Sequence, residues 1–302
     1  MKNFFSVTLL MLVGIIICAC SKQDEPTCVI DGSELIITVT CDKNTINRHI
    51  KNTFGKDAIN ICYRDDGSCL IKLRKECTSI PEEAFRNCDW LTHVCLGQNI
   101  TIIKKEAFAL CDKLIEAYSE GNFMEGIEDY AFRDCPNLSR VVFTPRFIGV
   151  SAFSGCNSLV DVRIGYEITE INDRTFFSCT SLTSITIPEA VISIGEMAFH
   201  NCKTLSQIIL SRNLEEIGRA AFQNCQISNI IIPSKVTKIG DYAFMSCNNL
   251  KKVYCEATEP PLIGNNIFAN NKDVQIYVPE KVVDNYKSAE GWNDYASFII
   301  GY

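Results

Sequence analysis

The sequence predicts a solenoid of about nine stacked 23-residue coils with a cap at each end. Phenylalanine recurs every 21–24 residues, cysteine stands three residues after each of the first eight phenylalanines, and isoleucine stands five residues before all nine. A repeat of this length is typical of stacked units that are each too small to bury their own apolar side. We therefore expect neighbouring coils to share one continuous core. The nine phenylalanines are Phe85, Phe108, Phe132, Phe153, Phe176, Phe199, Phe222, Phe244 and Phe268.

The order of residues within a coil is clearest in the copy at 182–202. Residues 185–187 read Ile-Thr-Ile, and this alternation predicts a short strand with one buried face. Pro188 ends the strand because proline has no N–H to donate to the ladder. Residues 196–202, Glu-Met-Ala-Phe-His-Asn-Cys, predict one tight helical or 3₁₀ turn. Each coil thus combines a strand, a turn and a buried phenylalanine.

These repeats resemble the leucine-rich repeats of the BspA-like (Treponema pallidum type) class over about residues 68–278. The closing stretch also resembles that family, with Ile-Tyr-Val-Pro at 276–279 and Gly-Trp-Asn-Asp-Tyr at 291–295. The resemblance implies an α/β fold, a right-handed leucine-rich repeat solenoid with one strand in each coil. The predicted organisation is a lipoprotein signal peptide at 1–20, an N-terminal cap region at 21–67, the solenoid at 68–278 and a C-terminal cap at 279–302.

The N-terminal cap region is less regular than the repeats. Its sequence predicts a strand at 35–40, a short helix at 44–54 and a turn at 65–67. The pattern of residues 71–80 matches that of 185–194, so we expect the solenoid to start near residue 68. A cap is expected before it, because an uncapped solenoid end exposes apolar surface and strand edges.

The first twenty residues predict a lipoprotein signal. The apolar run at 4–17 is too short for a comfortable membrane span and is typical of a secretory signal. Residues 17–20, Ile-Cys-Ala-Cys, resemble a bacterial lipoprotein cleavage site, which implies that Cys20 carries the lipid and is the only membrane anchor. The acidic residues that follow resemble the signal that sends Bacteroidota lipoproteins to the outer face of the outer membrane. The alternative is a cleaved signal and a soluble secreted protein.

Cysteine is abundant, with 17 residues, and many of them fall in the repeat. We expect the eight repeat cysteines to be reduced, buried thiols that act as small hydrophobes. The alternative is a ladder of stacked disulfides, which parallel Cβ vectors disfavour. Cys62 and Cys69 are candidates for a hairpin disulfide, and Cys28 and Cys41 for a bond across the cap. Cys95 aligns with an outward strand position, where we expect an exposed thiol.

Function in a solenoid is carried by an extended face built from equivalent positions. Two outward strand rows define that face here, two and four residues after each repeat leucine. Alternating charges in one half are also typical of a merely solvated face. An apolar run in the other half predicts a protein-contact site, although β-propensity alone also explains it. The candidate partner-binding residues are Glu116, Tyr118, Arg140, Asp161, Arg163, Ile209, Ile231 and Tyr254.

The sequence favours a non-enzymatic surface protein. It contains no Gly-rich phosphate loop, no His-Glu-x-x-His and no Gly-x-Ser-x-Gly. With only three histidines and no Cys-x-x-Cys, it predicts neither a metal site nor a cofactor. A net charge of −7 without a basic patch makes nucleic acid a poor partner. The resemblance implies adhesion to, or interaction with, a protein of a host or neighbouring cell, and the alternative is a glycan-binding surface lipoprotein.

Overall fold

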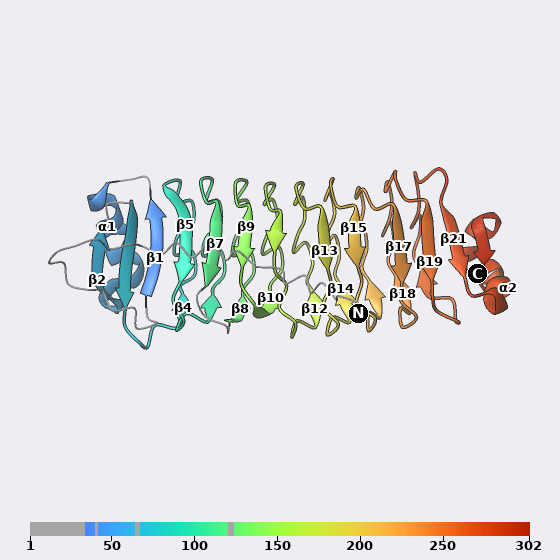
Figure 1. The fold of residues 1–302 in the computed structure, drawn as a ribbon, viewed down its shortest axis with the longest axis horizontal. Coiled ribbons are helices and arrows are strands. Elements are labelled where there is room, and N and C mark those ends of the chain that lie inside the picture. Colours follow the sequence, from blue (N-terminus) through green and yellow to red (C-terminus); the bar gives the residue numbers. More distant parts are fainter. Residues whose placement is uncertain (1–33, 40–41, 64–66, 120–123) are drawn as a thin grey trace, which may run out of the picture. The chain divides into compact units, whose positions relative to one another are not determined.

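The computed structural model describes residues 34–39, 42–63, 67–119 and 124–302. The coils stack in sequence order, and each coil contributes a strand to each of two strand rows (Figure 1). The predicted repeat solenoid is confirmed, because the described residues form coils that are each centred on one of the nine buried phenylalanines.

The first strand row carries the outward positions that the sequence singles out. Its strands are β5 (Leu91–Leu96), β7 (Glu116–Ser119), β9 (Arg140–Val142), β11 (Asp161–Val162), β13 (Ser184–Thr186), β15 (Gln207–Ile209), β17 (Asn229–Ile232), β19 (Lys252–Cys255) and β21 (Gln275–Val278). Paired strands run parallel, so Ile231 lies opposite Tyr254 and Tyr254 lies opposite Tyr277. The hydrogen-bonded ladder is interrupted between β11 and β13 and again between β15 and β17.

The second strand row contains shorter strands that end at the repeat isoleucine. They are β4 (Ser79–Ile80), β6 (Ile102–Ile103), β8 (Met124–Ile127), β10 (Pro145–Ile148), β12 (Glu170–Ile171), β14 (Ser193–Ile194), β16 (Glu216–Ile217), β18 (Lys238–Ile239) and β20 (Leu262–Ile263). Pairing is again parallel, with one interruption between β10 and β12 among the described strands.

The remaining side of each coil is a run of turns that contains the buried phenylalanine. The expected tight turn is present in the copy at 182–202, where the N–H of His200 donates to Met197 O at 3.1 Å, but it is a series of turns and not a helix. Met197 and Asn201 have positive φ values of 54° and 62°, which interrupt a helical run. The backbone N–H of Phe199 then donates to the carbonyl of Ala221 in the next coil at 2.8 Å. These turns therefore hydrogen-bond between coils.

A ladder of stacked phenylalanines fills the core. Ring centroids of neighbouring coils lie 5.1–5.8 Å apart, with interplanar angles of 1–20°. The backbones of neighbouring coils also approach closely, at the positions where a glycine follows the repeat isoleucine. A Cβ on Gly218 would lie only 2.5 Å from the carbonyl carbon of Gly195, so this close approach requires glycine.

The N-terminal cap differs from a simple continuation of the repeat. Strand β1 (Glu34–Val39) lies between β5 and β3 (Ser68–Leu73) and is antiparallel to both. The segment that matches a repeat strand in sequence, β3, is therefore separated from β5 by one inserted strand. Strand β2 (Ala58–Tyr63), which the sequence pattern does not predict, completes this edge of the sheet, and the short helix η1 (Gly55–Asp57) precedes it.

Helix α1 (Lys43–Phe54) covers the first coil, as the cap hypothesis expects. Asp42 caps its N-terminus, because the Asp42 carboxylate accepts a hydrogen bond from the backbone N–H of Asn44 at 2.9 Å. Its last residue, Phe54, packs against Phe85 with 6.1 Å between ring centroids. The helix thus covers the end of the phenylalanine ladder with a ring that is tilted by 51° to Phe85.

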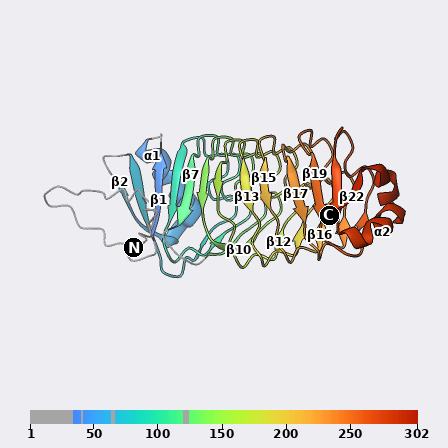
Figure 2. The ribbon, with the colours of Figure 1, turned by 45° about the vertical axis from the view of Figure 1, so that its right-hand side comes forward.

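The C-terminal cap closes the other end of the stack (Figure 2). It consists of η2 (Glu280–Val282), α2 (Val283–Ser288), η3 (Trp292–Phe298) and β22 (Ile299–Gly301), which pairs in parallel with β21. Trp292 is fully buried, donates its indole N–H to Pro261 O at 2.8 Å and packs edge-on against Tyr286. Buried aromatic rings therefore fix the cap to the last coils.

In the part of the chain that the structure describes, no helix is both long enough and apolar enough to cross a bilayer. The signal peptide and Cys20 lie outside the described residues, so the lipidation of Cys20 stays a prediction. The boundary proposed at residue 68 coincides with the start of β3 but is otherwise untested.

Candidate interaction surface on the first strand row

The half of the first strand row nearer the N-terminal cap carries paired charges. Arg140 on β9 lies beside Glu116 on β7 and Asp161 on β11, because the parallel register aligns these positions. Its guanidinium contacts Glu116 Oε1, and its Nε lies 3.2 Å from Asp161 Oδ2. The hydrogen bond with Glu116 raises the pKa of Arg140. Arg163 is exposed in the second outward row, and none of the ion pairs found among the described residues includes it.

The other half carries exposed apolar side chains on consecutive coils. Ile209 and Ile231 are 64% and 54% exposed, and their strands β15 and β17 are in contact. Tyr254 follows in register, and its ring stacks on Tyr277 with 4.8 Å between centroids and 17° between planes. The Tyr302 ring meets Tyr254 edge-on at 6.0 Å. The apolar run that the sequence indicates therefore extends into an aromatic cluster.

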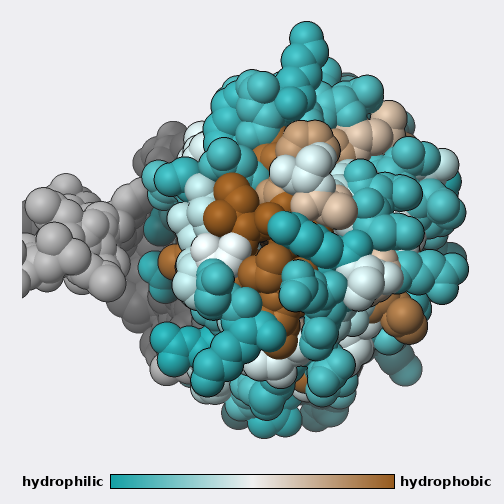
Figure 3. All heavy atoms as spheres, turned by 90° about the vertical axis from the view of Figure 1, so that its right-hand side faces the viewer, coloured by the Kyte–Doolittle hydropathy of each residue, from teal (hydrophilic) through white to brown (hydrophobic). Residues whose placement is uncertain are grey.

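Sequence reasoning missed three members of this surface, although a signal exists for one of them. Tyr277 stands 23 residues after Tyr254, one repeat further along the same row. Ile300 on β22 lies opposite Tyr277 and has no repeat signal, because the cap follows another pattern. The apolar stripe, as we name it, comprises Ile209, Ile231, Tyr254, Tyr277, Ile300 and Tyr302. Figure 3 looks along the stack onto its C-terminal end and shows hydrophobic residues gathered at that end, whereas the stripe runs along the side of the stack.

At the N-terminal end of the second outward row, the expectation of an exposed thiol at Cys95 is wrong. Cys95 is 4% exposed and not an exposed thiol, and burial continues through Val94 and Leu96. Cap strand β1 inserts beside β5, with Ile36 opposite Cys95, so this position belongs to the cap sheet. The next row member, Tyr118, is half-buried. The exposed part of the second outward row therefore starts beyond β5.

The repeat cysteines form a hydrogen-bonded row and not a reactive site. The Cys179 thiol donates to Phe153 O in the preceding coil at 3.3 Å, and the same bond recurs at 3.0–3.3 Å in seven coils. Burial raises the pKa of Cys156 and Cys202 to about 12. The prediction of reduced, buried thiols is confirmed for all eight repeat cysteines, because Cys88 in the first coil is also buried and free. In the ninth coil, Asn271 replaces cysteine and donates to the equivalent carbonyl at 2.9 Å.

The candidate disulfide between Cys62 and Cys69 stays a prediction, and the strand register disfavours it. Cys62 on β2 lies opposite Leu70, which is the neighbour of Cys69 on β3. Because adjacent residues of a strand point to opposite faces, the two cysteines point to opposite faces of the sheet. The other candidate pair, Cys28 with Cys41, lies outside the described residues.

Among the described residues, no group of three or more His, Cys, Asp or Glu side chains is placed so that it could bind a metal ion. Burial lowers the pKa of His49 and of His200, which keeps both imidazoles neutral near pH 7. The two rings lie in different parts of the fold, α1 and the coil of Phe199, and cannot act as a pair.

Fold and surface together define a leucine-rich repeat solenoid, in which parallel strands of stacked coils build one continuous face. The family model for the BspA type leucine rich repeat region matches residues 61–183 and 169–289, in six copies. The chain belongs to this family. A search among curated proteins finds no match.

Several solved structures of leucine-rich repeat proteins are similar to this chain. A leucine-rich repeat protein from Bacteroides ovatus is 21% identical, with a TM-score of 0.51 over 90% of this chain and 75% of that one. The leucine rich repeat protein of T. pallidum is also 21% identical, with a TM-score of 0.46 over 70% and 84%. A leucine rich cell surface protein from Faecalibacterium prausnitzii is 21% identical, with a TM-score of 0.46 over 86% and 72%. At this identity, the likeness to the Bacteroides protein supports the fold alone.

Proposed function

We propose that the protein is a non-enzymatic surface lipoprotein that binds a protein partner through the apolar stripe. The observation that carries the proposal is the row of exposed apolar side chains on adjacent coils, with Ile209 and Ile231 each more than half exposed. Single exposed hydrophobic residues are ordinary on a protein surface, but a contiguous apolar patch is typical of an interaction site. Tyrosines such as Tyr254 and Tyr277 add the aromatic anchors that dominate the binding energy of many interfaces.

The surroundings of the stripe indicate the kind of partner. Its neighbours in the first outward row are all exposed and polar, and they include a single charged residue. These residues are Gln207, Asn229, Lys252 and Gln275. A polar rim around an apolar centre is the usual anatomy of a protein interface. We therefore expect a partner surface that is apolar at its centre and weakly charged at its rim.

Glycan binding by the stripe itself is less favourable. A sugar ring packs its C–H face against the flat face of an aromatic ring, and such platforms need an uncovered ring. Tyr254 and Tyr277 stack on each other at 4.8 Å, and Tyr302 meets Tyr254 edge-on. The stack therefore covers one face of the Tyr254 ring and one face of the Tyr277 ring. The geometry therefore favours a protein partner at this surface.

The proposal includes an anchor at Cys20 and display on the outer face of the outer membrane. Acyl chains on one cysteine hold a protein firmly when more than one chain is attached. Radiolabelled palmitate should enter the wild-type protein and not the Cys20→Ala variant. Protease added to intact cells should remove the protein, and survival of the protein under that treatment would contradict surface display.

The stripe is tested by binding of the full chain in proteoliposomes to surface-protein extracts of epithelial cells and of neighbouring bacteria. The test variant carries Ile231→Asp and Tyr254→Asp, at two positions where side chains are exposed or half-buried. The matched control is Leu262→Asp on β20, because Leu262 is 75% exposed but lies in the second strand row. Quantitative mass spectrometry then compares the bound proteins.

We expect at least one extract protein to bind both the wild type and the Leu262→Asp control. The amount of this protein that binds the stripe variant should be more than tenfold lower. A circular-dichroism melting curve verifies that the stripe variant is folded. Equal binding by all three proteins would refute the stripe as the binding surface. Loss of binding after glycosidase treatment of the extract, with protein intact, would instead identify a glycan.

A further inference from the structure

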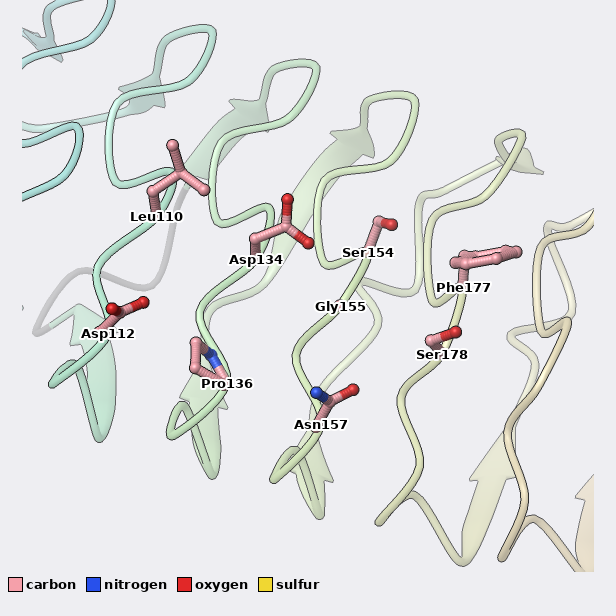
Figure 4. Close-up of a pocket in the computed structure, with 9 residues that line it drawn as sticks. All are labelled: Leu110, Asp112, Asp134, Pro136, Ser154, Gly155, Asn157, Phe177 and Ser178. Atoms are coloured by element: carbon pink, nitrogen blue, oxygen red, sulfur yellow. The ribbon is translucent and has the colours of Figure 1, made fainter.

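A groove of about 450 Å³ lies on the turn side of the solenoid, away from the apolar stripe. Figure 4 shows its lining on four successive coils, from the coil of Phe108 to the coil of Phe176. All lining positions fall one, two or four residues after the repeat phenylalanine. They are Leu110, Asp112, Asp134, Pro136, Ser154, Gly155, Asn157, Phe177 and Ser178.

In the coil of Phe153, the groove is lined by the small residues Ser154 and Gly155. Gly155 has a φ of 77°, but the equivalent residues Asn201 and Asn224 adopt φ of 62° with a side chain. The backbone therefore tolerates asparagine at this row, and glycine is not required for conformation. A Cβ on residue 155 would lie 2.3 Å from Asp134 Oδ1, which occupies the space that glycine leaves.

One wall of the groove is an aromatic ring held in place by a stack. Phe177 is half-buried, and its ring lies parallel to that of His200 in the next coil, with 5.1 Å between centroids and 2° between planes. His200 covers one side of Phe177, and Phe177 itself lines the groove. Leu110 and Pro136 add aliphatic surface along the same groove. A ligand can thus bury C–H groups here.

The polar lining consists of carboxylates, an amide and hydroxyls. Asp112 and Asn157 are exposed at the groove, and Asp134 places Oδ2 at 2.9 Å from Arg133 while Oδ1 leans over Gly155. None of the nine lining residues is basic. Carboxylates and hydroxyls bind the hydroxyl groups of a ligand, whereas the two lining carboxylates disfavour an anionic ligand.

We propose that this groove binds a neutral saccharide of one to three units. Its volume falls in the range of small-molecule sites, about 300–1,000 Å³. A sugar combines a C–H face, which suits Phe177, with several hydroxyl donors, which suit Asp112, Asp134 and Asn157. The site is independent of the stripe, so the protein partner and the saccharide can bind together.

Isothermal titration calorimetry tests the proposal on the full chain in a detergent that contains no sugar. The probes are lactose, cellobiose, N-acetyllactosamine and maltotriose, with sialyllactose and tri-lysine as charged comparisons. Gly155→Asn displaces the Asp134 carboxylate and narrows the groove, with a residue that the same row already uses at 201 and 224. Asn157→Ala removes one polar group, and Asn248→Ala, four residues after Phe244, is its matched control because both asparagines are exposed.

We expect at least one neutral probe to bind with a Kd of 1 mM or tighter. Binding should weaken more than tenfold in Gly155→Asn and about three- to tenfold in Asn157→Ala, the loss of one hydrogen bond, and stay unchanged in Asn248→Ala. No binding of any neutral probe, unchanged binding in the folded Gly155→Asn protein, or binding of tri-lysine or sialyllactose alone would each overturn the proposal. Variants of the stripe should leave saccharide binding unchanged, so the two proposals fail separately.

Discussion

The phenylalanine ladder predicts a large, local loss of stability when one ring is removed from its middle. Phe199 is fully buried, and its ring centroid lies 5.3 Å from that of Phe176 and 5.4 Å from that of Phe222. Phe→Ala at a site of this kind costs about 3–5 kcal/mol. The cavity cannot collapse, because the strand rows hold neighbouring coils at a spacing of about 4.8 Å. With a urea m-value of about 3 kcal/mol/M, the unfolding midpoint should fall by about 1–1.7 M.

Urea unfolding of the full chain, followed by circular dichroism, measures this loss for Phe199→Ala. The matched control is Phe147→Ala on β10, since Phe147 is 40% exposed and lies outside the ladder. Hydrogen exchange of Phe199→Ala should show lost protection in the coils on either side, because a solenoid is stabilised by contacts between neighbours. A midpoint that falls no further than that of the control would refute the ladder as the main stabilising element.

Three further predictions concern the sulfur row, the coil spacing and the charges. Burial raises the pKa of Cys156 and Cys202 from 9.0 to about 12, so the native state keeps protons that the unfolded chain releases. The stabilisation that these protonated thiols provide is therefore complete below pH 9 and is lost as the pH rises towards 12. Thermal melts at stepped pH will show this loss as a falling melting temperature. A melting temperature that stays constant to pH 11 would contradict the prediction. Gly218→Ala should cost about 1–3 kcal/mol, because its Cβ has no room beside Gly195, and an unchanged melting temperature would refute the close approach. The ion pairs of Arg140 with Glu116 and Asp161 are half-exposed. Double-mutant cycles should therefore give a coupling free energy of about 0–1 kcal/mol that vanishes in 1 M salt. A coupling free energy that does not change with salt would contradict this prediction.

Much of the fold is predictable from the sequence because each coil repeats the same few buried positions. The spacing of Phe199 and its equivalents sets the number of coils, and the Ile-Thr-Ile pattern at 185–187 places a strand of the first row. The turn is not predictable in this way. Glu-Met-Ala-Phe favours a helix by local preference, but hydrogen bonds to the next coil hold Met197 at positive φ instead.

The N-terminal cap shows the limit of repeat matching. Strand β3 has the repeat pattern, yet β1 pairs between it and β5. Sequence similarity within a coil does not reveal which strand will be its neighbour, because pairing is decided by segments far apart in the chain. For the same reason Cys95 is buried although its repeat position is an outward one.

The candidate surface was predictable in part. Ile209, Ile231 and Tyr254 follow from the row alignment, and all three line the stripe. Ile300 and Tyr302 belong to the cap and join the stripe only through the pairing of β22 with β21 and the contact with Tyr254. The groove beside Phe177 is lined by residues of four successive coils, an arrangement that a search for chemical motifs does not detect.

Site-specific cross-linking tests the central claim, that the apolar stripe is the protein-binding surface, most directly. A photoreactive benzoylphenylalanine replaces Tyr277 in one full-length protein and Leu262 in another, so that one probe lies on the stripe and the other on the second strand row. After irradiation with the partner bound, we predict a covalent adduct from position 277 and none from position 262. An adduct from position 262 alone, or equal adducts from both positions, would contradict the account.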